Sequence, residues 1–230
     1  MEFYPFAMAL TLSDSGRTLV FNVDALGLTT MASALRLQGV DVIGEALTTI
    51  NAENLYYSLK PQVILIDLPF DGDEVLSLVL KFRKTDPELG IVLLTSCPDL
   101  RLFGIDEQSL PRGTRIILKK SISDVSTITG TLSASRALAK KGAPSLWIGL
   151  DEHLKELSLE SLTDVQIETL RLLSQGLTNA EIARIRYVSE KSVEQSVARI
   201  AQHMKIPSDK YHNLRVQITA HFFHIIGASR

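Results

Sequence analysis

An alternation of short apolar runs with helical patterns in the first part of the chain constrains the fold more than any other feature. Five runs rich in Val, Ile and Leu have the length of β-strands: TLVFNV, VDVIGEA, QVILIDL, GIVLLTS and TRIILKK. Between them, segments such as TTMASALRLQG, AENLYYSL and DEVLSLVLKFRKT repeat apolar residues at helical spacing. Near-continuous apolar strands are typical of a parallel sheet buried on both faces. The pattern therefore predicts an α/β fold, a five-stranded, doubly wound parallel sheet with helices on both faces.

Length and charge favour two domains with different partners. A chain of 230 residues can bury two separate cores. From Ser161 to the end there are 9 Lys and Arg against 6 Asp and Glu, whereas the rest of the chain has 15 against 20. A basic C-terminal part suggests contact with a polyanion. Cys97 is the single cysteine, which excludes an intrachain disulfide and fits a reducing cytosol. No apolar run approaches the roughly 18 to 20 residues of a membrane helix, so we expect a cytoplasmic protein.

Local signals divide the chain into four segments. Residues 1–16 include the apolar MEFYPFAMAL, which has no basic stretch before it and is interpreted as a leader to the first strand. Residues 17–141 form the α/β domain. Residues 142–160 are predicted to be a linker, because Gly142 and Pro144 break any continuing helix. Within the linker, Trp147 is expected to pack on a domain, and LDEHLKEL has the pattern of one or two helical turns. Residues 161–230 have a purely helical period.

Polar residues stand at the predicted carboxyl ends of the strands, where ligands of open parallel sheets bind. Asp24 ends the first run and Asp67 the third, Thr95 and Ser96 end the fourth, and Lys119 and Lys120 end the fifth. Any one of them alone would be an ordinary solvated side chain. Together they predict a site at one rim of the sheet.

The motifs FNVDALG, VILIDLPF, IVLLTS and IILKK resemble the receiver domain of two-component response regulators, a flavodoxin-like fold, over roughly Arg17 to Lys141. The resemblance implies that Asp67 accepts a phosphoryl group, Asp24 binds Mg²⁺ together with Asp67, Thr95 donates a hydrogen bond, and Lys119 supplies the countercharge. A carboxylate nucleophile, a divalent cation and fixed donors are what such a transfer needs. It further implies a sensor histidine kinase as partner and no organic cofactor.

The receiver pattern has three departures. Val23 occupies the place of one of two adjacent acids, the loop LPFDGDE is shorter than usual, and Ile116 replaces a common aromatic. The first two weaken the expected metal site, for which Asp71 or Asp73 could compensate, and the third affects switching. We therefore expect Asp67 to be phosphorylated slowly or incompletely.

The C-terminal segment has the signals of a helix-turn-helix followed by a last helix. Capping boxes are expected at Thr163 with Gln166 and at Thr178 with Glu181, and Gly176 ends the first helix. Ser189 can cap the next helix, whose buried face is Val193, Val197, Ile200 and Met204. Asp209 is expected to start a last helix that buries Leu214, Ile218, Phe222 and Ile225 and leaves Val216 and Phe223 on another face. Such a set of helices is equally consistent with a plain bundle.

The stretch LTDVQIETLRLLSQGLTNAEIARIRYVSEKSVEQSVARIAQHMKI resembles the C-terminal domain of LuxR/FixJ (NarL-type) regulators. The matching positions are Leu162, Thr163, Leu170, Gly176, Asn179, Glu181, Ile182, Ala183, Ser189, Val193, Ile200 and Ile206. The resemblance implies a helix-turn-helix that binds double-stranded DNA in transcription regulation. It also implies a homodimer formed through the last helix, and gating by phosphorylation or by a replacement for it.

The residues expected to face DNA are Thr178, Arg184, Ser189, Lys191, Ser192, Glu194, Gln195, Ala198, Arg199 and Gln202. Phosphate contacts are expected from the helix start at Ser189 to Ser192 and from Arg184, Arg186, Lys191, Arg199 and Lys205. Glu194 stands where the family usually has Lys. A carboxylate near phosphates lowers affinity, although Glu can accept a hydrogen bond from a cytosine amine and Gln can pair with adenine.

Three functions compete on these grounds. The leading one is an atypical response regulator that binds DNA, not an enzyme. The second is a signalling or scaffold protein of the same architecture whose helix-turn-helix binds protein, for which Glu194 and the modest positive charge speak. The third is an enzyme on a flavodoxin-like fold, which is disfavoured because the first domain has no His and no nucleophile with a paired base.

Overall fold

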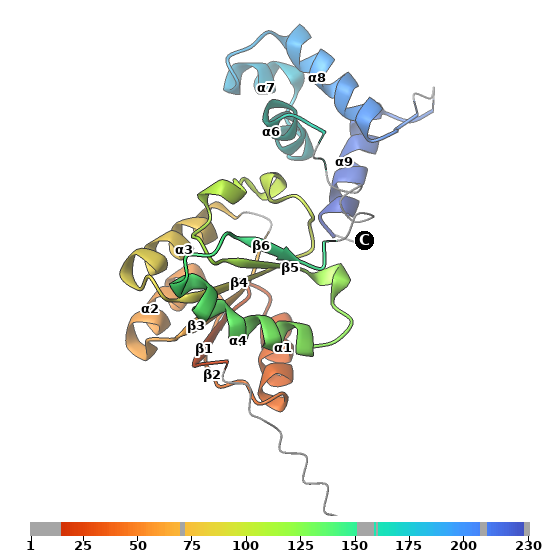
Figure 1. Cartoon of the computed structure of the whole chain (residues 1–230). Coiled ribbons are helices and arrows are strands. Elements are labelled where there is room, and N and C mark those ends of the chain that lie inside the picture. Colours follow the sequence, from red (N-terminus) through yellow and green to blue (C-terminus); the bar gives the residue numbers. More distant parts are fainter. Residues whose placement is uncertain (1–14, 70–71, 151–158, 160, 208–210, 228–230) are drawn as a thin grey trace, which may run out of the picture.

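The computed structural model describes residues 15–69, 72–150, 159, 161–207 and 211–227. Most of the predicted leader, the helical turns expected in LDEHLKEL, Asp71 and Asp209 lie outside these residues. Within the described part, an α/β domain is followed by four helices (Figure 1).

The first domain is built on a six-stranded sheet in which every neighbouring pair is parallel. Its order is β2-β1-β3-β4-β5-β6. The strands are β1 (Thr18–Phe21), β2 (Val42–Ala46), β3 (Val63–Asp67), β4 (Gly90–Thr95), β5 (Arg115–Leu118) and β6 (Leu146–Ile148). The predicted number of five is wrong, because β6 lies in the predicted linker and pairs with β5. β6 has only three residues, too few to show the alternating pattern of a strand in the sequence. It is a strand because it pairs with β5.

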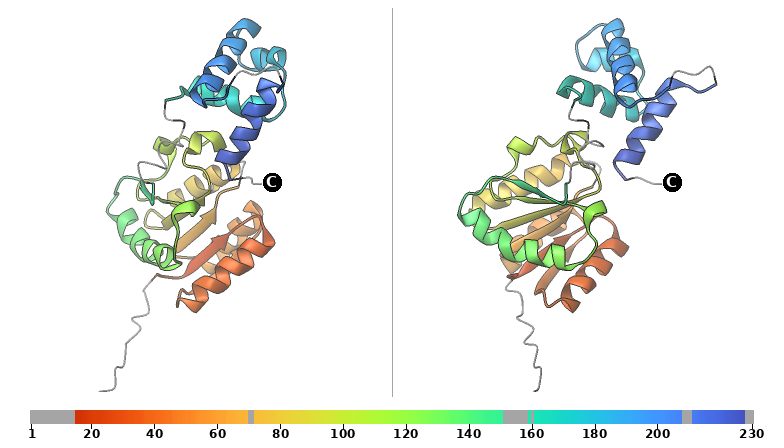
Figure 2. Two further views of the ribbon diagram at one scale, coloured as in Figure 1. Left: turned by 90° about the vertical axis from the view of Figure 1, so that its right-hand side faces the viewer. Right: turned by 45° about the vertical axis from the view of Figure 1, so that its right-hand side comes forward.

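Helices cover both faces of the sheet, as predicted (Figures 1 and 2). They are α1 (Ala25–Leu37), α2 (Thr49–Leu59), α3 (Asp73–Thr85) and α4 (Ser126–Lys140). The buried side chains of α1 and α4 share one apolar cluster with Val20, Leu65 and Val92, whereas those of α2 and α3 share the other with Leu19 and Ile64. Alternate strand residues thus point to opposite faces, which explains the continuous apolar runs.

The connection between β4 and β5 has no α-helix. It contains two 3₁₀ turns, η1 (Leu100–Phe103) and η2 (Glu107–Ser109), and a third, η3 (Lys119–Ser121), follows β5. Pro98, Gly104 and Pro111 interrupt the connection, and Gly104 has a positive φ of 78°. The regular repeat of strand and helix therefore fails here, and a compact loop takes the place of a helix.

The second part consists of α6 (Asp164–Ser174), α7 (Asn179–Ile185), α8 (Glu190–His203) and α9 (Leu214–Ile225). The capping box of Thr163 with Gln166 is confirmed, and the Ser189 side chain caps α8. The box predicted at Thr178 with Glu181 is wrong in one half: the Thr178 side chain caps α7, but the Glu181 side chain bonds Arg184 instead. Val193, Val197, Ile200 and Met204 are buried, as predicted. The predicted start of the last helix at Asp209 is wrong, because α9 begins at Leu214 and its N-cap is Asn213, whose side chain accepts the amides of Arg215 and Val216.

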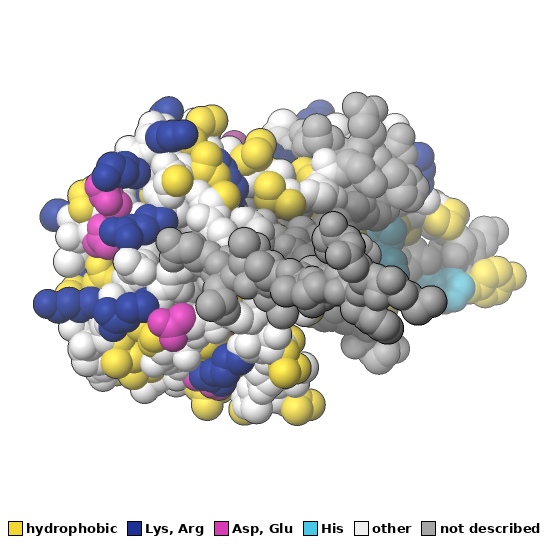
Figure 3. All heavy atoms as spheres, turned by 60° about the horizontal axis from the view of Figure 1, so that its bottom comes forward, with side chains coloured by type: hydrophobic (Ala, Val, Ile, Leu, Met, Phe, Trp, Pro, Cys, Tyr) yellow, Lys and Arg dark blue, Asp and Glu magenta, His cyan; other side chains and the backbone are white. Residues whose placement is uncertain are grey.

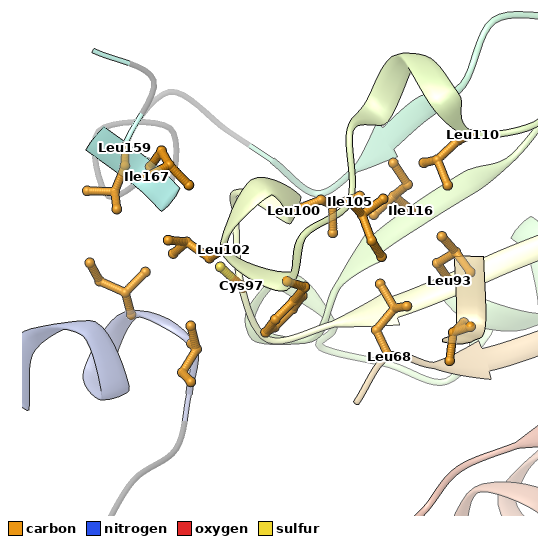
Figure 4. Packing of buried hydrophobic residues seen from close by; sticks show 14 of the residues in the cluster. Leu68, Leu93, Cys97, Leu100, Leu102, Ile105, Leu110, Ile116, Leu159 and Ile167 are labelled. Carbon is orange, nitrogen blue, oxygen red and sulfur yellow. The ribbon is translucent and has the colours of Figure 1, made fainter. Parts of the chain in front are cut away.

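One apolar cluster continues from the first domain into the second. It joins Leu102 of η1 to Leu159, Ile167 of α6 and the end of α9 at Ile225 and Ile226. Figure 4 shows Leu159 and Ile167 opposite Leu102 and Cys97. Therefore α6 and α9 face the sheet domain, whereas α7 and α8 lie on the far side (Figures 1 and 2).

In the view of Figure 3, Asp and Glu side chains lie beside Lys and Arg side chains, so positive and negative charges are mixed on this face. Ion pairs such as Lys140 with Glu88 and Arg36 with Glu45 have this mixed character. None of the helices in the described ranges is long and apolar enough to cross a membrane.

Candidate functional site

The carboxyl rim of the sheet brings Asp67 and Lys119 together, as the sequence predicts. Asp67 ends β3 with 15% of its side chain exposed, and its Oδ1 lies 2.5 Å from Lys119 Nζ. Its other oxygen, Oδ2, accepts a hydrogen bond of 3.0 Å from Asn22 Nδ2. Asn22 was missed by the sequence reasoning, although an amide inside the apolar run TLVFNV was a signal for it. Both carboxylate oxygens of Asp67 therefore already have donors.

The electrostatics of Asp67 combine opposing effects. Burial raises the pKa of the Asp67 carboxyl above its usual value, the hydrogen bond and charge of Lys119 lower it, and the charge of Asp24 raises it. The net direction is upward. The site therefore disfavours the ionised carboxylate in spite of its ion pair.

Asp24 is close enough to influence Asp67, but it serves the helix that follows. It is the N-cap of α1, and its Oδ2 accepts the Gly27 amide at 2.7 Å. Its own amide donates to Asn22 Oδ1 at 2.8 Å. A Cβ at position 27 would lie 2.7 Å from Asn22 Nδ2 and 2.8 Å from Asp24 Oδ2, so a larger residue there would displace both side chains.

The carboxylates at this rim do not fit a Mg²⁺ centre. Mg²⁺ demands near-octahedral oxygen coordination, and here the Asp67 oxygens and one Asp24 oxygen are already engaged. Val23, at the position of the first of the two adjacent acids, is exposed and apolar. Among the residues that the structure describes, no three His, Cys, Asp or Glu side chains are grouped to hold a metal.

Thr95 lies on the neighbouring strand, since Asp67 pairs with Leu94 in register. Its hydroxyl is fully buried, donates to the Cys97 carbonyl and accepts the Cys97 amide at 3.1 Å. The predicted hydrogen-bond donor is therefore turned to the backbone in this structure. Burial raises the pKa of the Cys97 thiol to about 12, which makes it a poor nucleophile.

The helix-turn-helix presents its second helix to solvent along one whole face. On α8, the exposed residues are Lys191, Ser192, Glu194, Gln195, Ala198, Arg199 and Gln202. Thr178 and Ser189, at the starts of α7 and α8, are exposed as well. The structure thus places every predicted DNA-facing residue of α8 on the side that neither domain covers.

The charged residues around this face are not equally available. Arg184 is 2.5 Å from Glu181 in an exposed pair. Lys191 and Arg199 have no hydrogen bond or ion pair within the described part of the chain. The prediction that Arg186 contacts phosphate is wrong, because its side chain is only 8% exposed and bonds Glu168 and the Thr169 hydroxyl of α6.

The last helix has the two faces predicted for it. Ile218, Phe222 and Ile225 are buried and Leu214 is half-buried, whereas Val216 and Phe223 are exposed. On the same helix, burial, followed by the charge of His224, lowers the pKa of His221. An exposed apolar pair of this kind is available for contact with a second chain.

Arg101 of η1 joins the two domains and was missed by the sequence reasoning. Its Nε and Nη2 donate to Asp99 at 3.0 and 2.8 Å. Its Nη2 also donates to the Leu159 carbonyl at 2.9 Å, and Nη1 donates to the Leu162 carbonyl at 3.0 Å and to Asp164 at 2.9 Å. These bonds, led by those to Asp99, raise the pKa of Arg101. A pocket of about 390 Å³ lies beside it between the domains, lined in part by Ile105 and Ile167.

Comparison with protein families finds one match in the helical part. A model of the family described as "Bacterial regulatory proteins, luxR family" (GerE) matches residues 160–211, which include α6, α7 and α8. Comparison with curated proteins finds no matching sequence.

Solved structures of a response regulator resemble the chain over nearly its full length. A complex of the two-component response regulator RcsB with DNA has 18% identity, covers 92% of this chain and 98% of its own, and gives a TM-score of 0.53. Two RcsB dimers bound to two parallel DNAs give the same values. RcsB from Salmonella enterica serovar Typhimurium, bound to promoter rprA with the phosphomimetic BeF₃⁻, has 18% identity, covers 90% and 98%, and gives 0.50. At identities this low, the structural similarity establishes a shared fold and nothing finer. Residues 160–211 are therefore similar to the luxR family of bacterial regulatory proteins, and the chain shares the fold of the RcsB structures.

Proposed function

We propose that the chain is a DNA-binding transcription regulator of response-regulator type that binds duplex DNA through α8. The observation that carries the proposal is the open face of α8 in the presence of the whole receiver-like domain. The luxR-family match to the same helices supports it, as do the RcsB structures with bound DNA. No domain movement is needed to uncover this face, so the unphosphorylated chain should bind DNA.

The proposed role of Asp67 is a weak phosphoacceptor. The surroundings of Asp67 disfavour its ionised form, and both of its oxygens already accept a contact from Lys119 or Asn22. The carboxylate is therefore a weak nucleophile for phosphoryl transfer. A histidine kinase is the expected partner if transfer occurs. We also propose a homodimer, which the exposed Val216 and Phe223 of α9 support.

The contacts to DNA divide by type. The amides and hydroxyls at the start of α8, together with Lys191 and Arg199, would hold phosphates, since helix N-termini favour anions. Gln195, Ala198 and Gln202 lie on the exposed side where base edges would be met. Glu190 and Glu194 balance Lys191 and Arg199, so this face has no net charge. We therefore expect modest affinity and a shallow dependence on salt.

The test is fluorescence anisotropy of the unphosphorylated full chain on random duplex DNA over a salt series. Glu194→Lys should tighten binding and steepen the salt slope by about one unit, because a new phosphate contact releases a counterion. Asp41→Lys makes the same charge change at an exposed residue just before β2, and it should alter neither the affinity nor the salt slope. Negligible binding by both wild type and Glu194→Lys at low salt would contradict the proposal and favour a protein-binding role.

A further inference from the structure

Tyr187, in the turn between α7 and α8, combines backbone strain with nearly complete exposure. Its φ is 54°, in the left-handed region, and 96% of its surface is exposed. A bulky side chain is disfavoured there, and Gly or Asn would end α7 more cheaply. The strain therefore points to a use of the side chain and not of the backbone.

Packing within the chain gives no reason for this tyrosine. Its hydroxyl and ring have no hydrogen bond or ring contact with any described residue. The neighbouring Ile185 and Val188 are exposed as well. We call these three residues the turn surface; it is an apolar tip that the fold leaves in water.

The turn surface stands next to the part of α8 that would approach DNA. Ser189, two residues later, caps α8, and its Oγ accepts the Ser192 amide at 3.2 Å. Two chain steps span at most about 7 Å between Cα atoms, and the tyrosine side chain extends this reach further. A recognition helix enters the major groove with its N-terminal residues on base edges. The residues just before it then run along the sugar-phosphate backbone.

We propose that Tyr187 is a DNA-contact residue, whose hydroxyl donates a hydrogen bond to a phosphate and whose ring lies over the adjoining deoxyribose. The proposal rests on DNA binding by α8 and adds a residue that no charge pattern reveals. The exposed face of α8 has no net charge, so charge alone attracts it only weakly to DNA. Uncharged contacts to the sugar-phosphate backbone of DNA then matter more, because they position the protein without distinguishing base sequence. Arg184, the nearest cation on α7, is already paired with Glu181.

An uncharged contact has a distinct signature. Tyr187→Phe removes only the hydroxyl, so affinity should fall about tenfold, the scale of a hydrogen bond to a charged group. The loss should be equal on all sequences, because phosphates carry no base information. The salt slope should stay unchanged, because no counterion is released. Lys191→Ala, by contrast, should lower the slope by about one unit.

The experiment measures anisotropy of the full chain on random duplexes across a salt series, together with thermal melting. Tyr187→Asn should bind at least as weakly as Tyr187→Phe yet melt no lower than wild type, since Asn tolerates the left-handed region. The matched control is Tyr211→Asn, an exposed tyrosine beyond the opposite end of α8, which should bind like wild type.

Three results would overturn the inference. If wild type binds and both Tyr187 variants bind equally well, Tyr187 makes no contact while the proposed function stands. If Tyr211→Asn weakens binding as much, the effect is not specific to the turn. If wild type itself does not bind DNA, the proposed function and this inference fail together.

Discussion

Arg101→Ala should uncouple the two domains, and the structure sets the size of the effect. The substitution leaves Asp99, whose side chain is 6% exposed, without its cation, and it removes the donors to the Leu159 and Leu162 carbonyls. Breaking a buried charge pair costs about 3 to 5 kcal/mol. Arg101 is 27% exposed, so the lower end applies. The bond to Asp164, which is 88% exposed, adds no more than about 1 kcal/mol. The expected loss is about 3 kcal/mol in the free energy of unfolding.

Urea denaturation of the full chain measures this loss with two probes. Trp147 fluorescence reports on β6, where the indole Nε1 donates to Glu107 at 2.9 Å, and far-UV circular dichroism reports on all helices. The two wild-type transitions should coincide, because one apolar cluster spans both domains. In Arg101→Ala the dichroism transition should separate and move to lower urea.

Arg36→Ala is the matched control, because Arg36 likewise pairs with a carboxylate and donates to a carbonyl, those of Glu45 and Val42, but is itself 47% exposed. The loss of this more exposed pair should cost under about 1 kcal/mol. Asp164→Asn should likewise have a small effect. If Arg101→Ala unfolded within about 0.5 kcal/mol of wild type with coincident transitions, the reasoning would be refuted.

Three further predictions concern Asp67 and α9. With a small-molecule phosphodonor and millimolar Mg²⁺, intact mass should show slow or incomplete modification that is lost in Asp67→Asn; rapid, complete modification would contradict the engaged carboxylate. Because burial raises the folded pKa of Asp67, its ionised form costs stability above that pKa, and the cost vanishes as pH falls through it. Asp67→Asn should therefore raise the melting temperature at pH 7 and raise it less in acid, and an equal shift at both would exclude this cause. Val216→Glu should weaken a dimer measured by sedimentation on or off DNA, and an unchanged dimer would place the interface elsewhere.

Short-range signals predicted the helical part well. Thr163 and Gln166 form their capping box, and Ser189 caps α8 as expected. The spacing of Val193 and Val197 gave the buried face of α8, and therefore the exposed one. These features depend on residues within one or two turns of each other, which a single sequence displays directly.

At the rim of the sheet, the sequence located Asp67 and Lys119 because parallel strands end on one side. It did not give the Asn22 bond to Asp67, which joins residues 45 positions apart. It also assigned Thr95 to the rim, whereas the folded loop turns that hydroxyl to Cys97. Which strand-end group contacts which depends on loop conformation and not on strand order.

The sequence by itself determined the alternating α/β domain, the helix-turn-helix and the residues that α8 exposes, because periodicity and caps act over a few neighbouring positions. Only the tertiary structure decided that β6 joins the sheet and that Arg186 packs against Glu168 and Thr169 of α6. It also decided that Arg101 binds carbonyls 58 and 61 residues away. Each of these depends on surfaces that meet only after the domains pack. The sequence shows only that a position is arginine. Whether its guanidinium group is exposed to a phosphate or bonded to a carbonyl inside the protein depends on the packing around it.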